Sequence, residues 1–139
     1  VVFPVHPRTW ANLRKHGLEQ KLLCNPAVLV LQTLGYAQMI CLTRNARFVV
    51  TDSGGLQEET TSLGVPCFTF RRNTERPATV DYGTNTLISD LEISSLNRQI
   101  ELLLAGKFKS GAVPPLWDGR AAERIARVLH RLYCSDSLP

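Results

Sequence analysis

The sequence predicts an α/β fold in which a Rossmann-like parallel sheet carries helices on both faces. Short apolar runs alternate along the chain with helical patterns, and this alternation is typical of parallel strands joined by right-handed helical crossovers. The clearest unit is the stretch 48–70, which reads as an apolar strand, a tight turn, a helix that stops at Gly64 and a second apolar strand. We therefore expect a βαβ unit in the middle of the chain.

The segments around this unit continue the alternation. Leu34-Gly35-Tyr36 opens one helix, and the last helix begins at Asp118 or Gly119 with apolar residues on one face. We assign the later helices to core packing. The expected strands are 1–5, 27–31 (a buried one) and an edge strand at about 86–88, and the other expected helices are about 10–16, 34–43, 77–82 and 93–103; the last helix carries Ala122, Ile125, Leu129 and Leu132 on its apolar face.

Composition limits the classes of protein that fit. The chain has 139 residues, of which 44% are apolar, and this is enough for one modest core. The net charge of +4 comes from scattered Lys and Arg, so it gives weak support for anionic ligands and poor support for nucleic acid. No apolar run has the length of a membrane span. We expect a cytoplasmic protein with neither a nucleic acid nor a membrane partner.

The four cysteines show no metal-binding or disulfide pattern. They contain no CxxC pair, and Cys67 lies inside an apolar strand pattern. Buried reduced thiols in a cytosolic protein are the better interpretation, so we predict neither disulfides nor zinc. The other three are Cys24, Cys41 and Cys134.

The turn that opens the central helix predicts an anion site. Ser53 stands at the expected N-cap, and Gly54 and Gly55 leave the first turn without side chains. Unpaired N–H groups and the positive end of the helix dipole favour a phosphate there. A capped helix start without a ligand is the alternative. Glu58 and Glu59 follow in the helix, and parallel sheets of this kind bind ligands at the carboxyl ends of their strands.

Seven motifs, in order along the chain, carry a resemblance to a known family. They are PVHPRT, LGY, TDSGGLQEE, LGVPC, NTERP, GTN and DGRAAERI. Together they resemble the non-hydrolysing UDP-N-acetylglucosamine 2-epimerases over nearly the whole chain. That family is similar to the glycosyltransferase-B architecture, in which two Rossmann-like domains hold the nucleotide in the cleft between them.

The resemblance implies that the chain is the carboxyl-terminal half of such an enzyme. The chain starts without Met inside an apolar run, which we interpret as the interior of a longer protein, with an N-terminal domain and a first strand missing before it. We expect one partial nucleotide-binding domain over 1–139, with an ordered core at 1–133 and a tail at 134–139. The parent is expected to be a homodimer that interconverts UDP-N-acetylglucosamine and UDP-N-acetylmannosamine by eliminating and re-adding UDP, with no cofactor and no metal.

The resemblance also implies where UDP binds. It assigns the diphosphate to Ser53, Gly54 and Gly55, and the ribose hydroxyls to Glu59. Arg76 corresponds to a ligand-contacting arginine that Glu75 could orient; a plain surface ion pair is the alternative, and one of Glu58 and Glu59 is expected to serve only as a charge near the helix start. The family's catalytic carboxylates belong to the missing domain, so no catalytic residue is expected in this chain.

Three further positions align with family site residues. Two of them carry a different residue here, and the third has two interpretations. Met39 replaces the aromatic residue that stacks on uracil, and a thioether offers dispersion but no ring. Leu34 replaces a glutamine, which leaves only a backbone contact. His6 matches a histidine linked to substrate or effector binding, and its alternative is a loop histidine bonded to local backbone. As whole functions, another UDP-sugar epimerase, a glycosyltransferase of this architecture or a non-catalytic nucleotide-sugar-binding module stay open.

Overall fold

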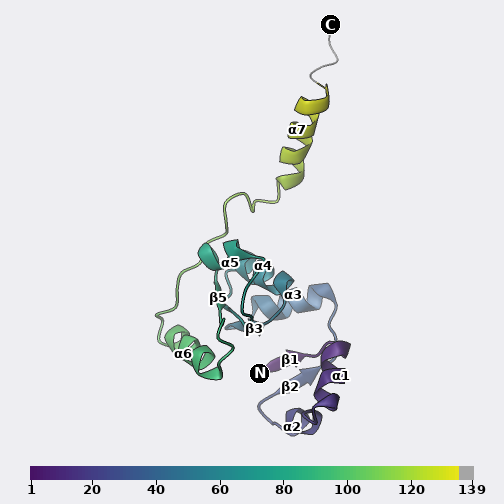
Figure 1. Cartoon of the computed structure of the whole chain (residues 1–139), viewed down its shortest axis with the longest axis vertical. Helices are drawn as coiled ribbons and strands as arrows, with labels where there is room; N and C mark the ends of the chain where they lie inside the picture. Colours follow the sequence, from purple (N-terminus) through teal and green to yellow (C-terminus); the bar gives the residue numbers. More distant parts are fainter. Residues whose placement is uncertain (135–139) are drawn as a thin grey trace. The chain divides into compact units, whose positions relative to one another are not determined.

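The chain divides into two compact units (Figure 1). A computed structural model describes residues 1–134, and for Cys134 it describes the backbone only. The first unit is Val1–Leu42 and the second begins at Thr43. The expected tail at 134–139 lies outside the described residues, apart from the backbone of Cys134 at the end of the last helix.

The first unit holds a two-stranded parallel sheet with two helices between its strands. Strand β1 (Val2–Pro4) pairs with β2 (Leu29–Leu31), and the crossover contains α1 (Pro7–Lys15) and α2 (Glu19–Leu23). Helix α1 was predicted, and it ends before Gly17, which adopts the left-handed φ of +67° that favours glycine. The five-residue α2 was not predicted, because so short a helix shows no clear periodicity.

The prediction that the strand at 27–31 is buried was wrong within the described residues. Leu29 is 58% exposed, and the other two residues of β2 are half-buried. The physical reason is that a sheet of two strands has too few neighbours to cover both of its faces. The next helix, α3 (Tyr36–Arg44), agrees with the predicted helix at 34–43 and crosses the boundary between the two units.

The second unit contains the predicted βαβ unit and extends it by one strand. Strands β3 (Val49–Thr51), β4 (Cys67–Thr69) and β5 (Asn85–Leu87) form a parallel sheet in the order β3-β4-β5. Helix α4 (Gly54–Leu63) joins the first two strands, and α5 (Pro77–Asp81) joins the second two. The stop at Gly64 is confirmed, since this residue has a φ of +70°.

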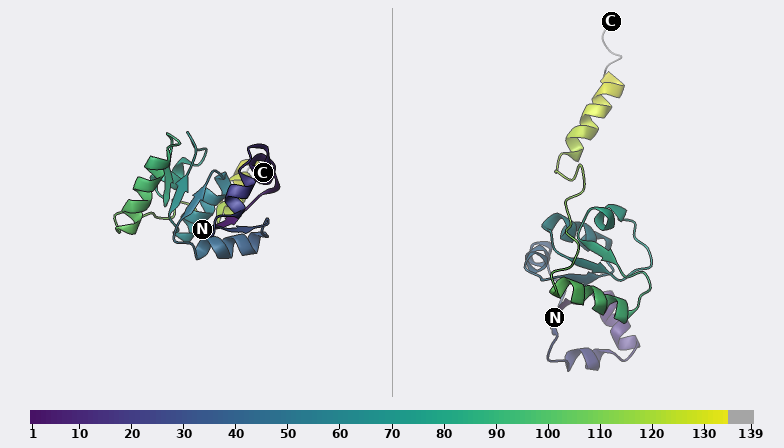
Figure 2. Two further views of the ribbon diagram at one scale, coloured as in Figure 1. Left: turned by 90° about the horizontal axis from the view of Figure 1, so that it is seen from below. Right: turned by 90° about the vertical axis from the view of Figure 1, so that its left-hand side faces the viewer.

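The core of the second unit lies around β4. All three residues of this central strand are buried, and the ring of Phe68 meets the rings of Phe48 and Phe108 edge to face at 5.6 and 5.5 Å. Helix α4 packs against all three strands, whereas α6 (Ile93–Leu104) lies on the other side of the sheet (Figures 1 and 2; Figure 2 gives the clearer view). Cys67 is buried here as predicted, and burial raises the pKa of its thiol. The prediction of burial was wrong for Cys24 and Cys41, which are exposed.

The last helix, α7 (Ala121–Cys134), contradicts the prediction that it packs into the core. Its apolar residues Ile125, Leu129 and Leu132 are each at least 50% exposed among the described residues. An amphipathic stripe indicates that a helix has a partner, but it does not say that the partner belongs to the same 139 residues. Helix α6 likewise has no fully buried residue, so the assignment of both helices to a closed core was too strong.

Candidate functional site

The candidate site in the second unit is built on the step from β3 into α4. The strand ends at Thr51, and Ser53 takes the N-cap position with the extended backbone that this position requires. The N–H of Ser53 donates to Thr51 Oγ1 at 3.0 Å, but the Ser53 hydroxyl makes no capping bond to the helix. The first N–H groups of α4 have no hydrogen-bond partner within the helix, as at any helix start, and the Ser53 side chain does not supply one.

Gly54 and Gly55 face open space in this structure. A Cβ added to Gly54 would meet no protein atom within 4 Å, and one added to Gly55 would meet only Ser53 Oγ at 4.0 Å. Neither glycine has a positive φ, so neither is needed for its backbone conformation. Packing among the described residues and backbone geometry therefore do not explain these two glycines, and bare backbone at a helix start leaves room for the close approach of a ligand.

The charged residues beside this turn are arranged differently from the prediction. Arg76 pairs with Glu58, with 2.9 Å between Nε and Oε1, whereas the carboxylate of Glu75 pairs with Arg71 at 3.2 Å. Glu75 thus does not orient Arg76 through its side chain; only its backbone carbonyl accepts a bond from Arg76, at 3.3 Å. Arg76 is the N-cap of α5, and from there its guanidinium reaches the carboxylate of Glu58 on α4.

The two glutamates of α4 have different surroundings, which the sequence did not separate. Glu58 is engaged by Arg76. Among the described residues, no hydrogen bond or ion pair engages the half-buried Glu59. A carboxylate without a protein partner can accept two hydrogen bonds from a vicinal diol. Of the predicted site residues, Ser53, Gly54, Gly55, Glu59 and Arg76 all belong to the second unit.

Sequence reasoning missed the polar residues buried beneath this surface. Gln57, Thr79 and Asn85 have no exposed surface, and they are joined to one another and to Thr74 by side-chain hydrogen bonds. A signal was present in the sequence, because Gln57 and Thr60 lie three residues apart on the face of α4 that meets the sheet. Polar residues on that face should have indicated a buried hydrogen-bond network.

The remaining predicted residues, His6, Leu34 and Met39, belong to the first unit. His6 is the exposed N-cap of α1, and its Nδ1 accepts the backbone N–H of Arg8 at 3.3 Å. The local backbone bond that was one of its two interpretations is therefore present. Leu34 and Met39 are half-buried, Leu34 just before α3 and Met39 within it.

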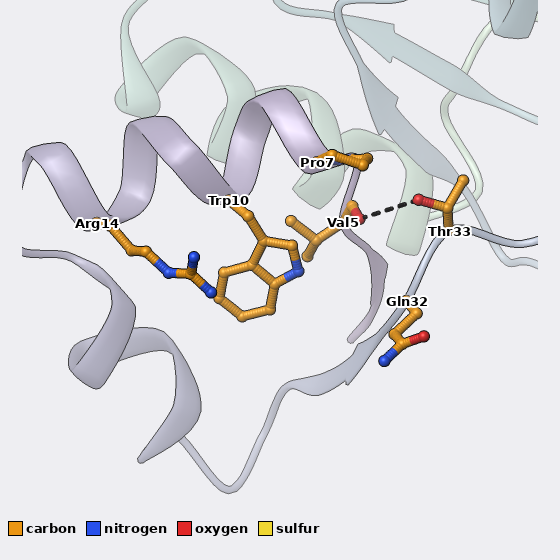
Figure 3. Close-up of a pocket in the computed structure, with 6 residues that line it drawn as sticks. All are labelled: Val5, Pro7, Trp10, Arg14, Gln32 and Thr33. Atoms are coloured by element: carbon orange, nitrogen blue, oxygen red, sulfur yellow. Dashed lines mark hydrogen bonds between the residues drawn. The ribbon is translucent and has the colours of Figure 1, made fainter.

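A pocket of about 440 Å³ lies in the first unit, next to these residues in sequence (Figure 3). The guanidinium of Arg14 lies 5.9 Å from the centre of the Trp10 ring and pairs with Glu19 at 3.1 Å, so its charge is already compensated. None of the predicted site residues lines this pocket. Its lining residues are Val5, Pro7, Trp10, Arg14, Gln32 and Thr33.

A second pocket, of about 430 Å³, opens in the second unit where β3 ends. Most of its lining is apolar, from Val50, Phe70, Ile93 and Leu96, with Thr51 and Asp52 at the end of the strand. Within residues 1–134, no group of three or more His, Cys, Asp or Glu side chains is placed to hold a metal ion. No described helix is long and apolar enough to cross a membrane.

The fold defines a Rossmann-like class of α/β domain. A parallel sheet leads into a helix start with bare glycines, and an arginine and a free carboxylate stand on the same unit. A model of the family described as UDP-N-acetylglucosamine 2-epimerase matches residues 1–130. The chain therefore belongs to the UDP-N-acetylglucosamine 2-epimerase family.

Individual relatives agree with this assignment. The chain is 40% identical to the UDP-N-acetylglucosamine 2-epimerase of Methanocaldococcus jannaschii, over 93% of this chain and 34% of that protein. It resembles the solved structure of the same organism's UDP-GlcNAc 2-epimerase in complex with UDP-GlcNAc and UDP, with a TM-score of 0.80 and 40% identity over 92% of this chain and 34% of that one.

The chain is also similar to a relative that is named for a different UDP-sugar. The UDP-2,3-diacetamido-2,3-dideoxy-D-glucuronate 2-epimerase of Pseudomonas aeruginosa is 34% identical over 95% of this chain and 35% of that protein. The chain spans about a third of the length of the curated relatives it matches, and it corresponds to their carboxyl-terminal portion. The predicted α/β fold, related to the glycosyltransferase-B architecture, is confirmed.

Proposed function

We propose that the chain is the UDP-binding part of an enzyme that interconverts UDP-N-acetylglucosamine and UDP-N-acetylmannosamine. The observation that carries the proposal is the start of α4, where two glycines face open space although the protein's own packing does not require them. Unpaired N–H donors at a helix start suit a diphosphate. Membership of the family supports the proposed reaction, and the start of α4 is the proposed binding site of UDP.

The division of UDP among residues follows from the chemistry of each group. Ser53, Gly54 and Gly55 offer backbone donors to the diphosphate, and Arg76 lies close enough to α4 to pair with Glu58 on its surface. Since both partners in that pair are about two-fifths exposed, the pair itself is weak, and a diphosphate can compete for the guanidinium. Glu59 is assigned to the ribose hydroxyls.

The first unit contributes residues to uracil and to a substrate or effector. Met39 covers a face of the base by dispersion, Leu34 offers a backbone contact, and His6 contacts substrate or effector. These roles rest on the resemblance of the motifs. UDP leaves and returns during the proposed reaction, so a fixed phosphate site stabilises the leaving group in both directions.

The proposed parent is a cytoplasmic homodimer whose amino-terminal domain completes the cleft. Free thiols at Cys24 and Cys67 suit a reducing compartment. The chain matches only about a third of the length of its relatives, and the resemblance places the family's catalytic carboxylates in the domain that precedes this portion. We therefore expect these 139 residues alone to give no UDP-N-acetylmannosamine from UDP-N-acetylglucosamine; turnover above background, followed by chromatography, would contradict this placement of the chemistry.

The experiment that tests the UDP site is Glu59→Ala in the whole enzyme, titrated calorimetrically with UDP and with pyrophosphate. The variant should bind UDP about 1.5–3 kcal/mol more weakly, which is typical of a lost hydrogen bond to a charged group. Pyrophosphate affinity should stay the same, because pyrophosphate has no ribose. Glu58→Ala is the comparison variant, because it removes the partner of Arg76 and leaves the carboxylate assigned to the ribose in place. Equal losses for both ligands, or no loss for UDP, would refute the ribose assignment and make Glu58 the next candidate.

A second candidate function has one observation in its favour. The Pseudomonas aeruginosa relative is named as an epimerase of a different UDP-sugar, and it matches this chain over the same region. The roles assigned to the UDP-binding residues involve uracil, ribose and diphosphate and not the sugar that is epimerised, so they fit both substrates. Turnover assays of the whole enzyme with each UDP-sugar distinguish the two functions. UDP binding without turnover of either would favour a non-catalytic nucleotide-sugar-binding module.

A further inference from the structure

A network of buried side chains connects the two halves of the proposed diphosphate site. Its members come from α4, β4, α5 and β5, all within the second unit, and each is fully buried. The members are Gln57, Thr69, Thr79 and Asn85. Carboxamides and hydroxyls lose hydration when they are buried, so apolar side chains would fill this space at a lower cost. Their hydrogen bonds must therefore explain their presence.

The carboxamide of Gln57 joins the helix start to the loop that carries Arg76. Its Nε2 donates to the carbonyl of Ser53 at 3.3 Å. Its Oε1 accepts from Thr74 Oγ1 at 2.6 Å and from Asn85 Nδ2 at 3.1 Å. The Gln57 side chain thus bonds both to the Ser53–Gly55 turn and to the 71–76 loop, and a shift of either segment would break one of these bonds.

The backbone of Arg76 is held on one side by the half-buried Thr74, which bonds to Gln57, and on the other by Thr79 of the network. Its N–H donates to Thr74 Oγ1 at 3.0 Å, and its carbonyl accepts from Thr79 Oγ1 at 2.7 Å. Asn85 connects the two sides, because its Nδ2 donates both to Gln57 Oε1 and to Thr79 Oγ1, the latter at 3.0 Å.

Asn85 is in turn fixed by the central strand. Its Oδ1 accepts from Thr69 Oγ1 at 2.6 Å. The amide group therefore uses its acceptor and its donors inside the protein, and it can take only one orientation. A fully satisfied buried network of this kind favours a single arrangement over its alternatives.

We propose that Gln57, Thr74 and Asn85 are positioning residues that hold the Ser53–Gly55 turn and the Arg76 backbone in one fixed geometry, so that both bind the same diphosphate. This inference rests on the proposed function. In the proposed arrangement, none of the three residues contacts the ligand. Their contribution is that the Arg76 backbone and the helix-start donors do not need to be ordered when UDP arrives.

The test is a double-mutant cycle on UDP affinity in the whole enzyme, with Thr74→Val and Arg76→Ala. Thr74→Val keeps the shape but removes the hydroxyl that Arg76 and Gln57 share, and it should lower UDP affinity about fivefold. Arg76→Ala should lower it about tenfold. If Thr74 acts through Arg76, the double variant should bind UDP no more weakly than Arg76→Ala alone. The fold losses in UDP affinity caused by Thr74→Val and by Glu59→Ala should instead multiply when the two substitutions are combined.

Two further variants separate positioning from general weakening of the fold. Thr74→Ser keeps the hydroxyl and should bind UDP as the unchanged protein does. Thr84→Val is a matched control, because Thr84 is a buried threonine beside Asn85 whose hydroxyl bonds to the carbonyl of Val65 at 2.6 Å, outside the network. It should leave UDP affinity unchanged even if it lowers the unfolding temperature.

Gln57→Glu gives an independent measurement. A protonated carboxyl can donate to the Ser53 carbonyl as the amide does, whereas an ionised one places negative charge beside the diphosphate. The UDP affinity of this variant should rise towards that of the unchanged protein as the pH is lowered, beyond any change in the unchanged protein over the same range.

The outcomes are distinct. Independent effects of Thr74→Val and Arg76→Ala, loss of affinity in Thr84→Val equal to that in Thr74→Val, or parallel pH profiles for Gln57→Glu and the unchanged protein would each overturn the positioning role. An unchanged enzyme that binds no UDP would overturn the proposed function and this inference with it.

Discussion

Two pairs of glycines in the second unit have opposite surroundings. Gly54 and Gly55 at the start of α4 face open space. Gly83 and Gly111 are tightly enclosed by other residues: a Cβ on Gly83 would lie 2.5 Å from the side chain of Thr61, and one on Gly111 would lie 2.6 Å from the carbonyl carbon of Gly83. The second pair is explained by the protein's own packing. The first pair is not, so its explanation has to come from outside the chain.

The largest effect is expected where the packing is tightest. Gly83→Ala should lower the free energy of unfolding by about 3 kcal/mol, because the new methyl group would also lie 2.6 Å from the Thr79 carbonyl, and backbone cannot move aside as a side chain can. Urea unfolding measures the loss, with Gly55→Ala as the matched control. Equal stability of the two variants would remove the contrast between the glycine pairs.

A smaller effect, on binding rather than on stability, is expected at the open pair. Gly55→Val should weaken both UDP and pyrophosphate about tenfold, since a branched side chain crowds the approach to the helix-start donors that both ligands use. Calorimetric titration of the whole enzyme with each ligand gives the comparison. A variant that loses UDP but keeps pyrophosphate would mean that this turn does not bind the diphosphate.

The smallest effect is a gain. Gly54→Ala should raise the free energy of unfolding by up to about 1 kcal/mol, because alanine is the better helix former and its Cβ meets nothing here. Thermal unfolding without ligand measures this change. If the variant is less stable than the unchanged protein, the packing around Gly54 is tighter than it is in this structure, and the argument from open space fails.

The parts of the fold that depend on local sequence were predictable. The step from β3 to α4 and the stop at Gly64 follow from apolar periodicity and from glycine's backbone freedom, both of which act over a few residues. Exposure of α7 was not predictable, since an apolar stripe at Ile125 and Leu129 looks the same whether its partner lies within these residues or elsewhere.

The site shows the same limit. The turn at Ser53 could be recognised from adjacent residues, but the partner of Arg76 could not. Sequence proximity suggested Glu75, whereas the guanidinium of Arg76 reaches Glu58 on α4. The bond between Gln57 and Asn85 joins residues 28 apart in the sequence, and only the paired strands bring them together.

The burial of Cys67 gives this protein an internal reporter of structural opening. The thiolate is the form of cysteine that attacks alkylating reagents, and this thiol is fully buried on the central strand with its pKa raised by burial. The thiol of Cys24 is exposed and should react at once. The slow rate at Cys67 then measures how often β4 separates from its neighbours, and the dependence of that rate on UDP shows whether ligand binding suppresses the separation.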